Sequence, residues 1–442
     1  MDFSLKTFRE DFIMGVSPEN IQATLKDLYE ELSHLEASVY DRGVLIAERD
    51  PIQFTLCFLV CLEKKIPVIL GNPYWSVSEW RSFDKQFAPA MSYGRSHNEN
   101  CTQVERLTVR DKGVVFIPTG GTTSAQLKFA KHRWASLKSQ AEMVQCYLKY
   151  ESINAVCCLP LFHVSGLMQV VRSIVSGGQI CFVLLEDLLK FDSGVRLNTF
   201  CISLVPTQLQ RIYDADPAFG CLKNFKRIFL GGAPANVFIL KKALAEGVPI
   251  TVCYGMTETA GMVVVQEEFD PPDAGGKPFP DVIITLNQED AIPKVNIQSP
   301  SLFEGYHGSP NSDLENGFLT NDIGSLTASG LLKIEGRADQ LIVSGGEKIA
   351  PSEVETLIRR FESVSDVLVV GEFSEEWGQS VVALVVPMQS VASSFKTDSL
   401  HGFLKKHLAK YKVPKRYILV SKLPLLESGK IDKHSLALLL KH

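Results

Sequence analysis

The chain has 442 residues, 45% of them hydrophobic and 21% charged, and a formal net charge of −5. Because a single compact core usually holds roughly 100 to 200 residues, we expect two or more domains. The acidic balance leaves no basic surplus for a nucleic-acid backbone, so nucleic acid is not an expected partner. The longest strongly apolar run, residues 54–62, is shorter than the roughly 20 residues that cross a bilayer. This run favours a buried helix, and we expect no transmembrane segment.

The first residues and the cysteines indicate the compartment. The N-terminal stretch carries acidic groups early and lacks an apolar signal core, so we expect no secretory or organelle address. The ten cysteines include no C-x-x-C pair matched by a second such pair or by a histidine pair. This pattern predicts buried thiols in a reducing compartment. We expect a cytoplasmic protein, or one of the plastid stroma if it is plastid-encoded, and the sequence leaves a homodimer open.

From about residue 40 to 260, short apolar runs alternate with longer amphipathic stretches such as 134–147 and 237–245. Because the short runs are apolar throughout, they are typical of parallel strands that are buried on both faces and flanked by helices. The expected fold class is therefore α/β. The predicted strands are GVLIAE, PVILG, GVVFIP, NAVCCLPL, GQICFVLL, TFCISLVP, FKRIFLGG and PITVCYG.

The pattern changes twice in the rest of the chain. After Gly261, acidic and proline-rich turns separate short runs such as VIITL and VNIQS, which predicts a small antiparallel β region. From about Leu341 we expect a small α+β domain with a helix opening at Ser352 and Glu353. Its further elements are strands near VSDVLVVGEF and SVVALVVP, a helix near 400–409 and a final strand YILV. The Gly-rich, charged join predicts domains at 1–338 and 339–442.

A hydroxyl- and glycine-rich segment follows the predicted strand GVVFIP. It contains Thr119, Gly120, Gly121, Thr122, Thr123 and Ser124, with Lys128 and Lys131 just beyond. Glycines let successive backbone N–H groups turn toward one point, and hydroxyls and lysines add donors and charge, which suits a polyphosphate. The spacing matches neither the P-loop nor the dinucleotide fingerprint. On these residues alone, a phosphate loop and a solvated strand-to-helix turn both remain open.

Four further segments carry candidate chemistry. LPLFHVSGL contains His163, although a lone histidine beside phenylalanine is more often a core residue. TVCYGMTETAG ends a strand with Glu258, a candidate magnesium ligand. GFLTNDIG places Asp322 at a strand end, where a carboxylate can bind both hydroxyls of a ribose. The fourth is LKIEGRADQLIVSGGEKIAPSEVE, followed far downstream by PLLESGKIDK around Lys430.

These ordered motifs resemble those of the adenylate-forming acyl-CoA ligases, which share their fold with firefly luciferase and nonribosomal peptide adenylation domains. The resemblance covers nearly the whole chain. NPYWSVSEW, PTGG and LPLFHVSGL are most similar to the o-succinylbenzoate–CoA ligases of menaquinone and phylloquinone synthesis, particularly those of cyanobacteria and plastids. The resemblance implies a large N-terminal adenylate-forming domain, with parallel sheets, flanking helices and a small β region. A small mobile C-terminal α+β domain would follow it.

The resemblance also implies a reaction and its cofactors. A carboxylic acid attacks the α-phosphorus of ATP in the presence of Mg²⁺, pyrophosphate leaves, and the thiol of coenzyme A then displaces AMP. The implied phosphate contacts are Thr119, Gly120, Gly121, Thr122, Thr123 and either Lys128 or Lys131, together with Thr257 on the α-phosphate and Glu258 on Mg²⁺. The implied nucleoside contacts are Gly231, Gly232, Ala233, Tyr254, Gly255 and Met256 near the adenine, and Asp322 and Arg337 near the ribose.

The remaining implied roles concern the acid, the hinge and coenzyme A. Lys430 would approach the α-phosphate, Asp339 would be the hinge, and Gly345 and Gly346 would line the coenzyme A tunnel. His163 would gate an acyl pocket lined by Ser165 and Gly166. Arg172, Thr207 and Gln208 are candidate partners for a second carboxylate, although one arginine in a helix is more often a surface charge.

Two alternative functions remain open, and the sequence departs from the family's motifs at two places. The acid could be another aryl or fatty acid, or the protein could bind adenylate without catalysis; the retained Glu258, Asp322, Arg337 and Lys430 speak against the latter. Ala125 to Lys128 replace the family's usual Pro-Lys-Gly, which leaves the choice between Lys128 and Lys131 open. Asn321 replaces the Gly of the ribose motif, yet the carboxylate of Asp322 is kept.

Overall fold

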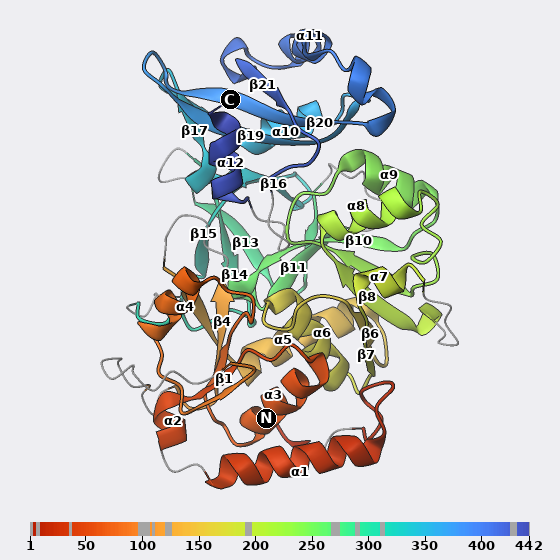
Figure 1. Ribbon diagram of the computed structural model, residues 1–442, viewed down its shortest axis with the longest axis vertical. Helices are drawn as coiled ribbons and strands as arrows, with labels where there is room; N and C mark the ends of the chain where they lie inside the picture. Colours follow the sequence, from red (N-terminus) through yellow and green to blue (C-terminus); the bar gives the residue numbers. More distant parts are fainter. Residues whose placement is uncertain are drawn as a thin grey trace.

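The structure is a computed structural model, shown in Figure 1. It describes residues 3–5, 9–34, 38–95, 107, 111–119, 126–190, 197–266, 275–287, 292–309, 314–424 and 431–441. The C-terminal elements lie at one end of the molecule and helix α1, Pro18–His34, at the opposite end. None of the helices in these ranges is long and apolar enough to cross a membrane.

The first sheet has the strand order β3-β1-β2-β4-β5. Its strands are β1 Val44–Ile46, β2 Val68–Leu70, β3 Met91–Tyr93, β4 Val114–Thr119 and β5 Lys128–Arg133. The first four pair in parallel, whereas β5 runs antiparallel to β4. Strands β1, β2 and β4 are predicted from the sequence, and β3 is not. The criterion of a continuous apolar run misses β5, because its sequence KFAKHR has only two apolar residues among four polar ones. The flanking helices in this part of the chain are α2 Ser38–Arg42, α3 Pro51–Glu63 and α4 Val77–Asp84.

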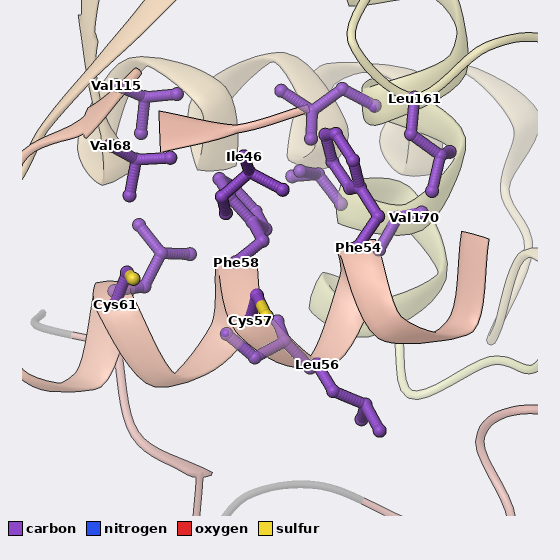
Figure 2. Packing of buried hydrophobic residues seen from close by; sticks show 14 of the residues in the cluster. Ile46, Phe54, Leu56, Cys57, Phe58, Cys61, Val68, Val115, Leu161 and Val170 are labelled. Atoms are coloured by element: carbon purple, nitrogen blue, oxygen red, sulfur yellow. The ribbon is translucent and has the colours of Figure 1, made fainter. Parts of the chain in front are cut away.

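Helix α3 is apolar on every side, and residues 54–62 are all buried, as the sequence predicts. Asp50 caps it by accepting a hydrogen bond from the backbone N–H of Ile52 at 2.9 Å, and a proline occupies the first turn, where no N–H donor is needed. Figure 2 shows Phe58 pointing from α3 toward Ile46 of β1. Leu56 points to the opposite side of the helix. The helix therefore fills the space between the first sheet and the elements beneath it.

The second sheet has the order β12-β11-β10-β9-β8-β6-β7. Its strands are β6 Asn154–Cys157, β7 Ile180–Phe182, β8 Phe200–Leu204, β9 Arg227–Leu230, β10 Ile250–Met256, β11 Gly261–Gln266 and β12 Lys277–Pro278. Strands β6 to β10 pair in parallel, as predicted. The residues after Gly261 are predicted to form a separate β region, but β11 pairs antiparallel with β10 and extends this sheet. The accompanying helices are α5 Trp134–Leu148, α6 Val164–Val175, α7 Leu185–Leu188, α8 Pro206–Ala215 and α9 Val237–Ala245.

Two further sheets complete the fold. The third, in the order β13-β14-β15-β16, is antiparallel throughout, as predicted. Its strands are β13 Ile283–Asn287, β14 Lys294–Gln298, β15 Phe318–Leu326 and β16 Leu332–Arg337. The C-terminal unit contains β17 Ile342–Ser344, β18 Glu347–Ile349, β19 Val364–Ser374, β20 Gly378–Pro387 and β21 Arg416–Leu419, with α10 Pro351–Ile358, α11 Thr397–His407 and α12 Lys433–Leu440. It is the α+β unit expected from the sequence, and α10 begins at its proline.

Candidate active site

One cluster of candidate residues forms where β15 and β16 pair. Asp322 lies opposite Arg337 in the register of the two strands, and Arg337 Nη1 donates to Asp322 Oδ1 at 3.0 Å. Tyr254, from β10, donates its hydroxyl to Asp322 Oδ2 at 2.7 Å. Burial and the charge of Asp322 raise the pKa of Tyr254, so its hydroxyl stays a donor. The structure thus brings together three residues that are far apart in the sequence.

Arg337 also contacts Asp339, which follows it in the short 3₁₀ turn Ala338–Gln340. The hydrogen bonds to Asp339 raise the pKa of Arg337, and the charges of Asp322 and Glu258 raise it further. Glu258 is therefore within electrostatic range of the first cluster. The guanidinium of Arg337 therefore contacts both Asp322 and Asp339, and it is also influenced by the charge of Glu258.

Glu258 lies in the 3₁₀ turn Thr257–Thr259, directly after β10. Its Oε1 accepts a hydrogen bond from the Tyr306 hydroxyl at 2.5 Å. Gly255 precedes the turn at a β-bulge, and a Cβ there would lie 2.0 Å from the carbonyl oxygen of Gly261. Only glycine fits that backbone approach, so the turn that carries Glu258 depends on Gly255 for its shape.

His132, on β5, fixes the same turn from the other side. It is fully buried, and its Nε2 lies 2.8 Å from the carbonyl oxygen of Thr257. Because a carbonyl only accepts, Nε2 carries the proton, and Nδ1 faces Ser136 Oγ at 3.0 Å. Burial lowers the pKa of His132 to about 4, so the ring is neutral. His132 is not predicted from the sequence, because its position facing Thr257 is apparent only once residues 128–133 are recognised as a strand.

Lys128 and Lys131 lie on opposite faces of β5, because side chains alternate along a strand. Lys128 shares its face with His132, and its Nζ lies 5.6 Å from the centre of the Tyr306 ring. Lys128 is thereby close to the residue that binds Glu258. Thr119, the last residue of β4, pairs with Lys128. Gly120, Gly121, Thr122 and Thr123 lie outside the residues that the structure describes, as does Lys430.

The glycines proposed for the adenine follow β9. A Cβ on Gly231 would lie 3.0 Å from the carbonyl oxygen of Cys253, so this loop packs closely against the strand that carries Tyr254. Gly232 has a φ of +90°, a conformation that favours glycine. Ala233 follows in the same loop, and Met256 ends β10. The Gly231–Ala233 loop and β10 are therefore adjacent, as the sequence motifs require.

The candidate acyl residues lie around the start of α6. His163 immediately precedes the helix, and its ring centre is 4.6 Å from that of Phe162. Ser165 and Gly166 are in the first turn, and a Cβ on Gly166 would lie 2.2 Å from the carbonyl oxygen of Pro160. Packing alone therefore requires glycine at 166. Thr207 is in the first turn of α8.

Arg172 is buried near the end of α6, with 4% of its surface exposed, so it is not the surface charge that an isolated helical arginine more often is. Its Nη2 donates to Ser203 Oγ at 3.2 Å, and its guanidinium carbon lies 5.5 Å from the centre of the Phe229 ring. Among the residues described, no carboxylate forms an ion pair with it. Burial lowers the pKa of Arg172, because a charged group is less stable away from water.

The glycines proposed for coenzyme A form the turn between β17 and β18. Ser344 pairs with Glu347, and Gly345 and Gly346 both have positive φ, at 60° and 86°. Such a two-residue hairpin turn needs a left-handed conformation at both central positions. The N–H of Gly345 donates to the carbonyl oxygen of Trp377 at 2.9 Å, which joins this turn to the β19–β20 hairpin.

The donors around Glu258 fit a magnesium ion that is bound mainly by a substrate. Over the described ranges, no group of three or more His, Cys, Asp or Glu side chains could hold a metal by itself. Mg²⁺ is usually held by one or two carboxylates together with substrate phosphates and water. A single carboxylate near Lys128 suits that mode of binding.

Comparison with known proteins identifies the family. A model of the AMP-binding enzyme family matches residues 65–307. The chain belongs to the AMP-binding enzyme family. A model of the C-terminal domain of AMP-binding enzymes matches residues 353–430. The large N-terminal part and the small C-terminal part of the fold are thus both those of adenylate-forming AMP-binding enzymes.

Individual AMP-binding enzymes are similar over most of the chain. The 2-succinylbenzoate–CoA ligase of Lactococcus lactis subsp. lactis is 31% identical over 335 residues, which are 74% of this chain and 71% of that protein. The o-succinylbenzoate CoA synthetase (MenE) of Bacillus subtilis, solved with the acyl-adenylate OSB-AMP, has a TM-score of 0.78 at 23% identity. ATP-bound MatB from Rhodopseudomonas palustris has a TM-score of 0.80 at 21% identity. Each alignment covers 96% of this chain and 94% of the solved one, and both establish the fold.

Proposed function

We propose that this adenylate-forming acid–thiol ligase joins coenzyme A to 2-succinylbenzoate through an acyl-AMP intermediate. AMP and pyrophosphate would be released, and the product would serve menaquinone or phylloquinone synthesis. The similarity to curated 2-succinylbenzoate–CoA ligases supports the choice of acid. The structural observation that carries it is the buried guanidinium of Arg172.

A buried charge without a counter-ion is costly, so buried arginines are normally paired. Arg172 has a hydroxyl and an aromatic face as neighbours, together with the thiols of Cys157, Cys201 and Cys253. 2-Succinylbenzoate has two carboxylates, one to be activated and one that is free to bind an arginine. The second carboxylate would supply the missing anion. A monocarboxylic aryl or fatty acid would leave Arg172 uncompensated, which disfavours those substrates.

The nucleoside would be held between β10, the third sheet and the Gly231–Ala233 loop. In the structure, Tyr254 and Arg337 each donate to one oxygen of Asp322, which fixes the carboxylate. Each oxygen keeps a further lone pair, and the two hydroxyls of a ribose could donate to them. The adenine would lie between the Gly231–Ala233 loop and Tyr254, with Gly255 and Met256 shaping the strand end.

The phosphates would lie between β5 and the turn that carries Glu258. Thr119 to Thr123 and Lys128 would contact the β- and γ-phosphates, and Thr257 the α-phosphate. Lys128 is the better candidate of the two lysines, since it shares a strand face with His132. Mg²⁺, held by Glu258, would neutralise charge on the phosphate oxygens. Lys430 would add a positive charge at the α-phosphorus as the acid attacks, because the acid and ATP are both anions.

The second half-reaction would use the other face of the small domain. We propose that residues 339–442 turn about Asp339, so that the Gly345–Gly346 turn replaces Lys430 at the acyl-adenylate. His163, Ser165 and Thr207 would line the route to the acid. Two sequence-based expectations accompany this model and stay predictions: a cytoplasmic or stromal location, and a kinship with the cyanobacterial and plastid ligases.

A coupled assay tests the proposal. The enzyme would receive ATP, Mg²⁺ and coenzyme A with 2-succinylbenzoate, benzoate or a fatty acid, with pyrophosphate measured and thioesters identified by mass. We expect the succinylbenzoyl thioester and little turnover of the monocarboxylic acids. A thioester formed from a monocarboxylic acid but not from 2-succinylbenzoate would refute the choice of acid. ATP binding without AMP formation for any acid would favour a protein that has lost catalysis.

A further inference from the structure

We infer that Tyr306 is a positioning residue that orients the Glu258 carboxylate toward the metal–nucleotide complex. This inference rests on the proposed function, because it concerns the proposed magnesium ligand. Tyr306 is half-buried and donates to Glu258 Oε1, while Oε2 accepts no hydrogen bond from the residues described. A glutamate held by one oxygen presents the other in a defined direction. An unrestrained glutamate would sample several rotamers.

The backbone around Tyr306 is fixed on two sides. On one side, residues 304–307 pair with β5: Lys131 N–H donates to Gly305 O at 2.9 Å, and Glu304 N–H donates to Lys131 O at 2.7 Å. On the other side, the N–H of Phe303 donates to the carbonyl oxygen of Glu258 at 2.9 Å. Glu258 is therefore bound by this segment at its main chain and at its side chain. Tyr306 cannot move without disturbing one of these contacts.

Tyr306 also lies close to both opposite charges of the proposed phosphate site. The ammonium of Lys128 lies 5.6 Å from the ring centre, and the hydroxyl at the ring's edge contacts Glu258. Within the described ranges, Lys128 and Glu258 form no ion pair with each other. A direct pair would neutralise both groups, whereas this arrangement leaves Lys128 available to phosphate and Glu258 available to the metal.

The Tyr306 hydroxyl is the donor in this hydrogen bond, because an ionised carboxylate only accepts and a phenol is protonated around neutral pH. Partners that hydrogen-bond a metal ligand typically contribute about 10- to 100-fold to metal affinity. Losing this hydroxyl should therefore weaken metal binding while the acid and coenzyme A sites are unaffected.

The test measures metal binding without turnover. Mn²⁺ binding to the enzyme with ATP, and without acid or coenzyme A, would be followed by electron paramagnetic resonance for the wild type, Tyr306→Phe and Tyr93→Phe. Tyr93 is a matched control, since its hydroxyl donates to Glu31 at 2.9 Å and β3 lies at the opposite edge of the first sheet from β5. We expect Tyr306→Phe to weaken Mn²⁺ binding about tenfold or more, and Tyr93→Phe to leave it unchanged.

A double-mutant cycle makes the result specific to Glu258. In a Glu258→Gln background, Tyr306→Phe should cause little further loss of Mn²⁺ affinity. Equal losses in both backgrounds, unchanged affinity in Tyr306→Phe, or tighter binding would overturn the inference; tighter binding would mean that Tyr306 competes with the metal. If the wild type binds no Mn²⁺ with ATP, the proposed function fails as well. If the metal binds as expected but no acid is turned over, only the proposed function fails.

Discussion

Arg337 donates to both carboxylate oxygens of Asp339, from Nε to Oδ1 and from Nη2 to Oδ2, each at 2.9 Å. The third nitrogen of the same guanidinium contacts Asp322. The proposed ribose ligand and the proposed hinge thus share one arginine. Any rotation at residue 339 that moves the Asp339 carboxylate changes the contacts of Arg337, and so would affect the proposed nucleotide site.

Replacing Asp339 with proline should separate the two half-reactions. Proline fixes φ and removes a backbone donor, so it restricts rotation at this position. We expect acyl-AMP formation, measured by pyrophosphate release, to remain while thioester formation falls at least about tenfold. Asp339→Ala is the matched control, because it removes the contact with Arg337 and keeps the backbone free. Full retention of both steps in Asp339→Pro would argue against rotation at this residue.

Lys430→Ala should impair the first half-reaction selectively. Loss of one preorganised charge at a reacting phosphoryl group typically costs about 10² to 10³ in rate. Acyl-AMP formation should fall by that factor, whereas thioester formation from supplied acyl-AMP should persist. The exposed Lys441, replaced with alanine, controls for loss of a cation from the same domain. Equal loss in both steps would contradict the proposed role.

Arg172→Met should lower activity without lowering the stability of the fold. Replacing a buried unpaired charge with an apolar side chain is often neutral or stabilising, so the Tm should stay the same or rise. The kcat/KM for 2-succinylbenzoate should fall by about 10- to 100-fold, the cost of a lost charged contact, with the KM for ATP unchanged. Arg211→Met on α8, an exposed position, is the control. A lower Tm with unchanged kcat/KM would give Arg172 a purely structural role.

The buried His132 should make stability depend on pH. Burial lowers its pKa in the folded state from 6.5 to about 4, so the unfolded chain binds more protons between those values. The neutral, buried His132 therefore adds to the free energy of unfolding in full above pH 6.5. As the pH falls from 6.5 toward 4, protonation of the unfolded chain lowers that free energy by up to about 1.4 kcal/mol per pH unit. When unfolding midpoints are measured from pH 4 to 7.5, the midpoint of His132→Asn should fall less steeply toward acid pH than that of the wild type. The exposed His34→Asn should leave this pH dependence unchanged, and equal slopes in wild type and His132→Asn would contradict the assignment.

Cysteine alkylation should distinguish Cys146 from the other cysteines that the structure describes. Cys146 is exposed, whereas the others are buried or half-buried. Burial raises the pKa of Cys57, Cys157 and Cys253 to about 12, so little reactive thiolate is present near neutral pH. Iodoacetamide at pH 8, followed by peptide mapping, should modify Cys146 first. Modification of Cys157 at the same rate would contradict the packing around α6.

The sequence predicts the elements whose signal is local. Apolar runs and turn residues identify the parallel strands β6 to β10 of the second sheet, and Pro351 marks the start of α10. β5 is not predicted from its sequence, because one face carries Lys131 and Arg133 and the other carries Lys128 and a buried histidine. The burial of Arg172 is not predicted either, because an isolated arginine looks like a surface charge until α6 is known to be enclosed.

The site itself is predictable only in part. Ordered motifs make Glu258, Asp322 and Arg337 candidates, since each lies in a recognisable segment, and the structure places Asp322 beside Arg337. Tyr306 and His132 have no such signal, because their roles depend on contacts with residues 48 and 125 positions away. Such partners are known only once the strands and the intervening segments are placed in space.

The pairing between β5 and residues 304–307 has a consequence for solubility. β5 is the outermost strand of the first sheet, and an open edge strand offers backbone groups to other chains. Here the hydrogen bonds of Phe129 and Lys131 to this segment occupy that edge. A deletion within 303–307 would therefore expose an edge that can recruit further copies. Self-association would accompany the loss of the contacts that hold Glu258.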